Sequence, residues 1–120
     1  MENHRLVLPG DLNQYGFLFG GKLLAWVDEA CWIAASLDFP GCQFVTVAMD
    51  RVEFRKSVRE GTILTIRSER IREGRTSVTY AVEVVDRDVV DKPIFATNVT
   101  FVRVDERGDK LVIREGGNGK

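Results

Sequence analysis

The segment "DLNQYGFLFGGKLLAWVDEACWIAA", residues 11–35, decides the fold, because it contains the one convincing helix of the chain. Its polar, glycine-containing start is typical of a turn, and an apolar run begins after Gly20 and Gly21. We predict a helix from Gly21 to about Ser36. Pro40 disfavours helical geometry in the residue before it and should end the helix.

Apolar side chains cover most of this predicted helix. At about 100° per residue, one broad arc holds Leu23, Leu24, Val27, Ala30, Cys31, Ala34 and Ala35. Trp26, Trp32 and Ile33 fall outside the arc, so the helix needs more cover than one sheet face gives. Either the sheet wraps around it or a second subunit covers the rest. Asp28 lies at the edge of the arc, and Glu29 lies on the opposite side with Lys22.

The rest of the chain is typical of strands. In "QFVTVAMDRVEF", residues 43–54, Val45, Val47 and Met49 share one face, and the apolar parity then shifts. This shift predicts a bulge near Asp50 or Arg51. Further strands are expected at 4–8, 62–71, 76–86, 95–105 and 110–115, with a tight turn around Gly74. One helix with an antiparallel sheet of this kind is an α+β fold.

Length and composition indicate one domain, residues 1–115, followed by a small glycine-rich tail, 116–120, that we expect to be disordered. The net charge of −1 gives no reason to expect nucleic acid or a membrane surface as a partner. No apolar run approaches the ~20 residues of a membrane-spanning helix. With no signal-like start and no metal-type cysteine pair, we expect a cytoplasmic protein with reduced thiols.

Asp28 is the residue that an ordinary apolar helix does not explain. A carboxylate at the border of a buried face is either a solvated boundary residue or part of a site. The pair Gly20-Gly21 leaves free N–H groups at the helix start, which attract developing negative charge. Asp28 is two turns further on, about 10 Å, an interval that a substrate or another chain could bridge. Asn13 could orient water or close an Asx-turn.

Other catalytic constellations have no support in the sequence. His4 is the single histidine and has no partner pattern, so a triad or a histidine-dependent dehydratase is not expected. There is no metal-ligand cluster and no phosphate-binding glycine loop.

The segment "LPGDLNQYGFLFGGKLLAWVDEA", residues 8–30, resembles the opening motif of hotdog-fold acyl-CoA thioesterases of the acyl-CoA hydrolase type. The positions in register are Asp11, Asn13, Gly16, Phe19, Gly20, Gly21, Asp28, Glu29 and Ala30. Residues 46–84 are similar to the central strands of that family. The resemblance covers about residues 5–105.

The resemblance implies a long helix wrapped by an antiparallel sheet of five to six strands. It implies a homodimer joined at its sheet edges, with active sites between subunits, assembled into a hexamer (a trimer of dimers) or a tetramer. The activity would be hydrolysis of acyl-CoA to a free acid and CoA without a metal or other cofactor. Asp28 would be the general base or the nucleophile, the Gly21 N–H the oxyanion donor, and Asn13 of the other subunit a positioning group. Glu29 is a rival carboxylate, disfavoured by its position on the opposite face.

Coenzyme A needs cations for its phosphates and donors for its pantetheine arm. The resemblance implies substrate-binding roles for Gly20, Thr46, Arg55, Lys56, Arg59, Gly74, Arg75, Thr76 and Ser77. The arginines could equally form a solvated sheet face, and Thr46 could be an ordinary sheet threonine.

Alternatives to catalysis stay open on the sequence. One is a non-catalytic module that binds acyl-CoA as a sensor or scaffold, and another is a small interaction domain in which Asp28 is a boundary acid. Trp26, Trp32 and Phe39 could line an acyl tunnel or fill a subunit interface.

Overall fold

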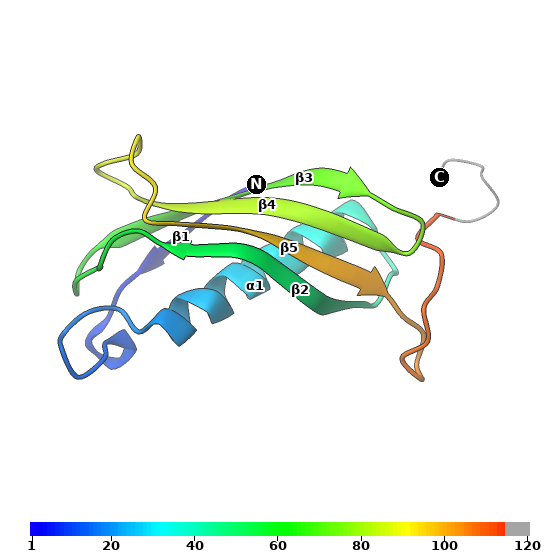
Figure 1. Ribbon diagram of the computed structural model, residues 1–120, viewed down its shortest axis with the longest axis horizontal. Helices are drawn as coiled ribbons and strands as arrows, with labels where there is room; N and C mark the ends of the chain where they lie inside the picture. The colour runs from blue at the N-terminus through cyan, green and yellow to red at the C-terminus, as the bar shows by residue number, and fades with distance from the viewer. Residues whose placement is uncertain (115–120) are drawn as a thin grey trace.

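One long helix and a five-stranded antiparallel sheet make up the computed structural model, which describes residues 1–114. Helix α1 (Gly20–Asp38) lies across one face of the sheet (Figure 1). The strands are β1 (Glu2–Leu6), β2 (Phe44–Phe54), β3 (Ile63–Glu73), β4 (Ser77–Asp86) and β5 (Phe95–Arg103), in the order β1-β3-β4-β5-β2. A short 3-10 helix, Pro9–Asp11, precedes α1. The α+β class and the predicted helix are confirmed.

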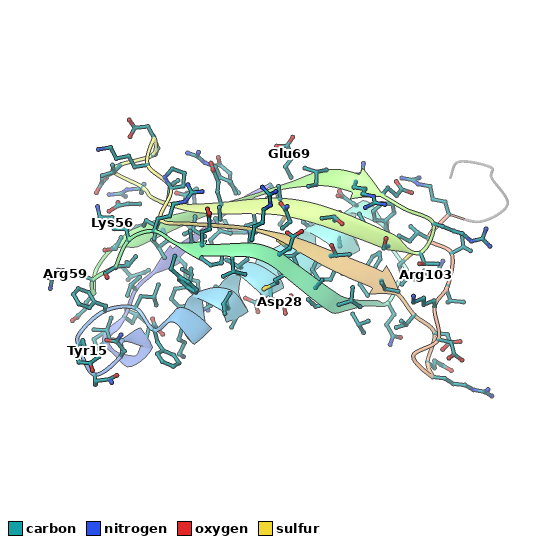
Figure 2. The ribbon with its side chains drawn as sticks, viewed as in Figure 1. Tyr15, Asp28, Lys56, Arg59, Glu69 and Arg103 are labelled. Carbon is teal, nitrogen blue, oxygen red and sulfur yellow. The ribbon has the colours of Figure 1, made fainter. Side chains whose placement is uncertain are left out.

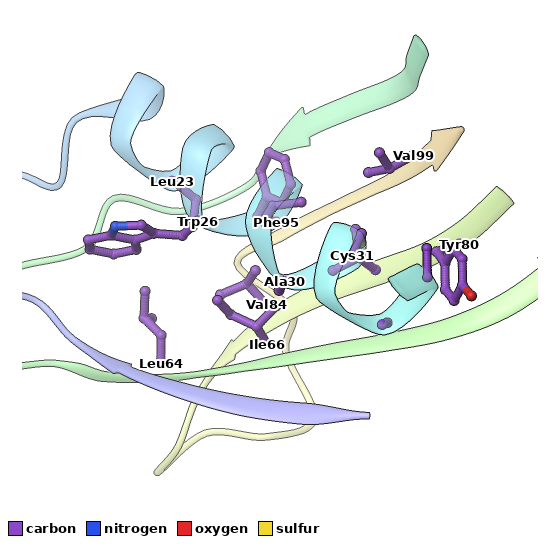
Figure 3. Packing of buried hydrophobic residues seen from close by; sticks show 14 of the residues in the cluster. Leu23, Trp26, Ala30, Cys31, Leu64, Ile66, Tyr80, Val84, Phe95 and Val99 are labelled. Carbon is purple, nitrogen blue, oxygen red and sulfur yellow. The ribbon is translucent and has the colours of Figure 1, made fainter. Parts of the chain in front are cut away.

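The apolar arc of α1 is buried against the sheet, as its spacing predicted. Figure 3 shows Leu23, Trp26, Ala30 and Cys31 packed over side chains of the strands, among them Tyr80. Full burial of one large apolar side chain stabilises a fold by roughly 1.5–3 kcal/mol, so this face alone fixes the helix to the sheet.

Trp26 corrects one expectation. It was placed outside the buried arc, but it is only 7% exposed. The guanidinium of Arg5 lies 4.6 Å from the centre of its ring and covers it. Arg5 also forms an ion pair of 3.2 Å with Glu29, so β1 and its neighbours cover the helix where the sheet face does not reach.

Strand β2 contains two irregularities where the sequence predicted one. The expected bulge is confirmed: the register with β5 shifts between Asp50 and Glu53, and Arg51 has a φ of 54°. A second shift lies between Thr46 and Ala48. It makes the predicted common face of Val45, Val47 and Met49 wrong, because the two valines are 42% and 54% exposed while Met49 packs on the core.

The predicted strand at 110–115 is also wrong within the described residues. Lys110 forms only an isolated bridge with Val104. The Asp105 carboxylate accepts backbone N–H groups at 107 and 109 and tightens the turn. The chain then crosses back, so that the Ile113 N–H donates to the Arg75 carbonyl. The proposed tail, 116–120, and residue 115 lie outside the described residues.

Within residues 1–114, no helix is both long enough and apolar enough to cross a membrane. The same residues contain no group of three His, Cys, Asp or Glu side chains that could hold a metal ion.

Candidate active site

Asp28 lies midway along α1, where the helix passes the edge strand β2 (Figure 2). The Thr46 hydroxyl donates a hydrogen bond of 2.6 Å to Oδ1 of Asp28. Asp28 is half-buried and Thr46 is exposed, so one carboxylate oxygen is held in place while the group stays within reach of solvent. A carboxylate that is fixed, ionisable and accessible can act as a base towards water.

A second hydrogen bond joins the same two elements one helical turn further on. The indole Nε1 of Trp32 donates to the Phe44 carbonyl at 3.1 Å. Phe44 and Thr46 are two residues apart on β2 and therefore face the helix together. The sequence left open whether Thr46 binds substrate or is an ordinary sheet threonine, and it did not indicate the Trp32 contact. Both hydrogen bonds depend on the position of β2 relative to α1, which no local pattern specifies.

The surroundings of Asp28 separate it from the other candidate groups. Burial raises the pKa of the Cys31 thiol to about 12, with a smaller contribution from the charge of Asp28. Cys31 is therefore a protonated core side chain rather than a thiolate nucleophile. Glu29 is exposed and paired with Arg5, on a different side of the helix from Thr46.

The N-terminus of α1 is open, as the glycine pair predicted. The first amides bonded to the helix are those of Lys22 and Leu23, both to the Phe19 carbonyl, and no side chain caps the end. The N–H groups of Gly20 and Gly21 precede those bonds. A Cβ on Gly21 would lie 3.1 Å from the Phe19 ring, so the position accepts a side chain poorly.

Asn13 closes an Asx-turn, one of its two predicted roles. Its Oδ1 accepts N–H groups from Tyr15 at 2.9 Å and Phe17 at 3.1 Å. The backbone N–H of Asn13 donates to the Phe17 carbonyl at 2.7 Å, and only the side-chain Nδ2 takes no part in the turn. The turn holds Asn13 close to the start of α1, so the positioning role proposed for it is compatible with the geometry.

Several predicted residues meet at the helix N-terminus. Asn13, Gly20, Arg55 and Lys56 line one hollow of about 370 Å³. Arg59 lies beside it, with its guanidinium 4.9 Å from the centre of the Phe17 ring. In Figure 2, Lys56 and Arg59 lie at this end of the molecule.

The three basic side chains at this end of the molecule, Arg55, Lys56 and Arg59, differ in whether a carboxylate pairs with them. Arg55 forms an ion pair of 2.6 Å with Glu53, and this pairing lowers the pKa of the Glu53 carboxyl. Among the described residues, Lys56 and Arg59 have no carboxylate within salt-bridge distance. These two side chains are therefore the stronger candidates for contact with phosphate groups.

The second predicted CoA segment lies elsewhere in the protomer. Gly74, Arg75, Thr76 and Ser77 form the hairpin between β3 and β4, at the opposite end of the sheet from the 55–62 loop (Figure 1). Strand β3 has 11 residues, and at ~3.4 Å per residue it separates the two ends by roughly 35 Å. Gly74 donates its N–H to the Ser77 carbonyl at 2.7 Å, and Thr76 accepts from the Arg103 N–H. One protomer therefore does not bring the two predicted segments together.

Comparison with known proteins agrees with this fold and motif. The sequence model of the thioesterase superfamily matches residues 15–92. An uncharacterised acyl-CoA thioester hydrolase of Buchnera aphidicola is 33% identical over 109 residues, which span 86% of this chain and 80% of the relative.

Two solved structures share the fold closely. The hexameric thioesterase of Yersinia pestis superimposes with a TM-score of 0.84 at 29% identity, over 92% of this chain and 91% of the other. An acyl-CoA hydrolase of Staphylococcus aureus, solved with butyryl-CoA and CoA, gives 0.83 at 30% identity, over 93% of this chain and 70% of that one. Structures of the Staphylococcus enzyme also include alanine variants of an asparagine, an aspartate and a threonine.

The chain therefore belongs to the thioesterase superfamily. Within it, the chain is a hotdog-fold thioesterase of the acyl-CoA thioester hydrolase type, as the resemblance indicated.

Proposed function

We propose that this protein hydrolyses the thioester bond of acyl-CoA, with Asp28 as the catalytic carboxylate and the Gly21 N–H as the oxyanion donor. The observation that carries the proposal is the hydrogen bond of 2.6 Å between Thr46 and Asp28, on a helix whose N-terminus is uncapped. Asp28 either removes a proton from the attacking water or attacks the carbonyl itself. In both routes the negative charge that develops on the thioester oxygen is stabilised by a backbone N–H at a helix start.

The active site is proposed to lie between two subunits. Gly21 and Asp28 of one helix are separated by about 10 Å of helical rise, too far for both to act on one carbonyl. Asp28 of one protomer and Gly21 of another can do so if two helices lie side by side. Asn13, close to the start of α1, would then come from the same protomer as Gly21. The exposed valines along the free edge of β2 supply an apolar surface for such a pairing.

The Staphylococcus enzyme supports the choice of residues. Its substituted asparagine precedes its substituted aspartate by 15 residues, the separation of Asn13 and Asp28 here. Its substituted threonine follows the aspartate by 17 residues, whereas Thr46 follows Asp28 by 18. The same three residue types therefore occur in the same order with nearly the same spacing.

CoA is proposed to bind across protomers as well. The hollow at Gly20, with Lys56 and Arg59 at its margin, provides cations for the phosphates. The hairpin at Arg75 can reach the same CoA only from another protomer. The Yersinia thioesterase is hexameric, and a hexamer built from dimers would supply such a neighbour. The proposed reaction requires no metal or organic cofactor. The cytoplasmic location expected from the sequence stays a prediction.

The test is free-thiol release from short, medium, long and aromatic acyl-CoA substrates. Wild type, Asp28→Asn and the matched control Glu29→Gln would be compared, with circular dichroism to verify folding. Loss of a general base typically costs 10²–10⁴-fold in rate, so kcat of Asp28→Asn should fall by about that factor while Glu29→Gln stays near wild type.

Two outcomes would contradict the proposal. Full activity in Asp28→Asn would remove the carboxylate from the mechanism. Binding of CoA without release of thiol from any substrate by the wild type would indicate a non-catalytic acyl-CoA sensor instead.

A further inference from the structure

Strand β2 is held to the sheet from one side. It is an edge strand, and its neighbour in the sheet order is β5. The Gln43 carbonyl, just before β2, accepts the Val104 N–H at 2.9 Å. Carbonyl groups of successive residues in an antiparallel strand point to opposite sides, so the Phe44 carbonyl points away from β5, towards the free edge. Two register shifts further along β2 weaken its alignment on β5, so the sheet alone specifies its position relative to α1 poorly.

Two hydrogen bonds from α1 add what the sheet lacks. The indole Nε1 of Trp32 donates to the Phe44 carbonyl at 3.1 Å, and the Thr46 hydroxyl donates to Asp28 at 2.6 Å. Trp32 lies one turn beyond Asp28, about 6 Å along the helix axis. Phe44 lies two residues before Thr46, about 7 Å along the strand. Because these intervals nearly match, the two bonds fix the strand to the helix at neighbouring levels.

The three aromatic residues that the sequence could not assign have different surroundings. Trp26 and Phe39 are 7% and 5% exposed and belong to the core. The Phe39 ring packs edge-on against the Phe44 ring, with 6.1 Å between their centres. Trp32 is 44% exposed in the protomer and lies towards β2, the strand proposed to meet a second subunit. Phe44 is thus anchored by its side chain in the core and by its carbonyl on Trp32, two residues before Thr46.

The two bonds respond differently to the proposed reaction. The Asp28 carboxylate gains a proton or a bond to the acyl carbon during turnover, and either change removes its charge and weakens the bond from Thr46. The indole N–H and the peptide carbonyl do not ionise, so the bond between Trp32 and Phe44 keeps its strength throughout. It can therefore hold β2 in place while the bond at Asp28 weakens.

We infer that Trp32 is a positioning residue, whose indole N–H holds β2 at the level that keeps the Thr46 hydroxyl on Asp28. The inference rests on the proposed acyl-CoA hydrolysis and adds to it a residue that acts through Thr46 without touching the substrate. Loss of the N–H should therefore lower kcat, and it should do so only while the Thr46 hydroxyl is present.

The experiment is a double-mutant cycle on kcat, measured by thiol release under saturating butyryl-CoA. Trp32→Phe, which keeps an aromatic ring without the N–H, is made alone and together with Thr46→Val. Trp32→His is the rescue variant, because Nε2 of its five-membered ring can take the place of the indole Nε1 and carries a proton in a neutral tautomer at about pH 8. Trp26→Phe is the matched control, the same ring change at the other tryptophan of α1. Circular dichroism and size-exclusion chromatography verify the fold and the assembly of each variant.

Trp32→Phe should lower kcat by about three- to tenfold, no more than removal of the Thr46 hydroxyl itself, and KM should stay within about twofold of wild type. In the Thr46→Val background the same substitution should change kcat by less than about twofold, because the two residues act as one unit. Trp32→His should recover most of the loss. Trp26→Phe should change kcat by the same factor in both backgrounds.

Three results would overturn the inference. An equal loss from Trp32→Phe in both backgrounds would make Trp32 a structural or interface residue independent of Thr46. A Trp32→His enzyme as slow as Trp32→Phe would show that the N–H is not the group that matters. A rise in KM at unchanged kcat would indicate contact with the substrate. Absence of acyl-CoA hydrolysis by the wild type, or full activity in Asp28→Asn, would instead overturn the proposed function on which the inference rests.

Discussion

Replacing Thr46 by valine should lower kcat about tenfold while the fold and KM stay close to those of the wild type. The Thr46 hydroxyl donates to Oδ1 of Asp28 at 2.6 Å, a distance typical of a hydrogen bond to an ionised oxygen. Bonds of this kind contribute roughly 1.5–3 kcal/mol. Because Thr46 is exposed, water competes for the carboxylate, so the lower limit applies. About 1.5 kcal/mol corresponds to about tenfold in rate.

Valine is a suitable replacement because it keeps the branched shape and the strand preference of threonine. The bond orients the carboxylate and does not hold the CoA, so the loss should appear in kcat. Thr46→Ser keeps the hydroxyl and should recover most of the activity. The assay is thiol release under saturating butyryl-CoA, with thermal unfolding as a stability check. A Thr46→Val enzyme within twofold of wild-type kcat, or a serine variant as slow as the valine one, would refute the reasoning.

Two further predictions concern stability. Burial, with help from the charge of Asp28, raises the pKa of Cys31 from 9.0 to about 12. Above pH 9 the folded state therefore keeps a proton that the unfolded chain releases. The contribution of this thiol to the free energy of unfolding is complete below pH 9. It is lost as the pH rises towards 12, at up to about 1.4 kcal/mol per pH unit. Urea unfolding at pH 8 to 11 should show a steeper decline for wild type than for Cys31→Ala, and parallel declines would contradict this. Separately, Arg51→Gly should raise the free energy of unfolding by about 1 kcal/mol, because Arg51 has a φ of 54° that costs a side chain about that much. Arg51→Ala keeps the strain and should not stabilise, so equal stabilisation by both variants would show that the backbone is not the cause.

The sequence predicted much of the fold because its signals are local. The spacing of apolar residues placed the helix within two residues of its observed ends, Gly20 and Asp38. Alternation and turn residues placed β2, β3, β4, β5 and the hairpin at Gly74. The first strand, expected at 4–8, lies two residues earlier, at Glu2–Leu6. The parity change along β2 predicted the bulge at Arg51. Each signal depends on neighbours a few residues apart, which the chain carries in its order.

The errors share one physical origin. The bulge between Thr46 and Ala48 leaves no clear mark in an alternating apolar pattern, yet it decides which side chains of β2 face the helix. Trp26 is buried because Arg5 lies over it, and Arg5 belongs to β1, the edge strand opposite β2 in the sheet. The apolar run at 111–113 is typical of a strand. The turn at Asp105 directs it instead across the hairpin between β3 and β4, where the Ile113 N–H donates to the Arg75 carbonyl.

By itself, the sequence determined one apolar helix with a carboxylate at its border, an uncapped glycine start and the strands that cover it. These follow from periodicity and turn chemistry, which act over a few residues. Only the tertiary structure decided that Thr46 holds Asp28, that Trp32 reaches Phe44, and that Lys56 shares a hollow with Gly20. These contacts join residues 12 to 36 positions apart, and their geometry depends on the register and bulges of β2 relative to α1. No local pattern specifies that placement; it follows from the packing of the whole sheet on the helix.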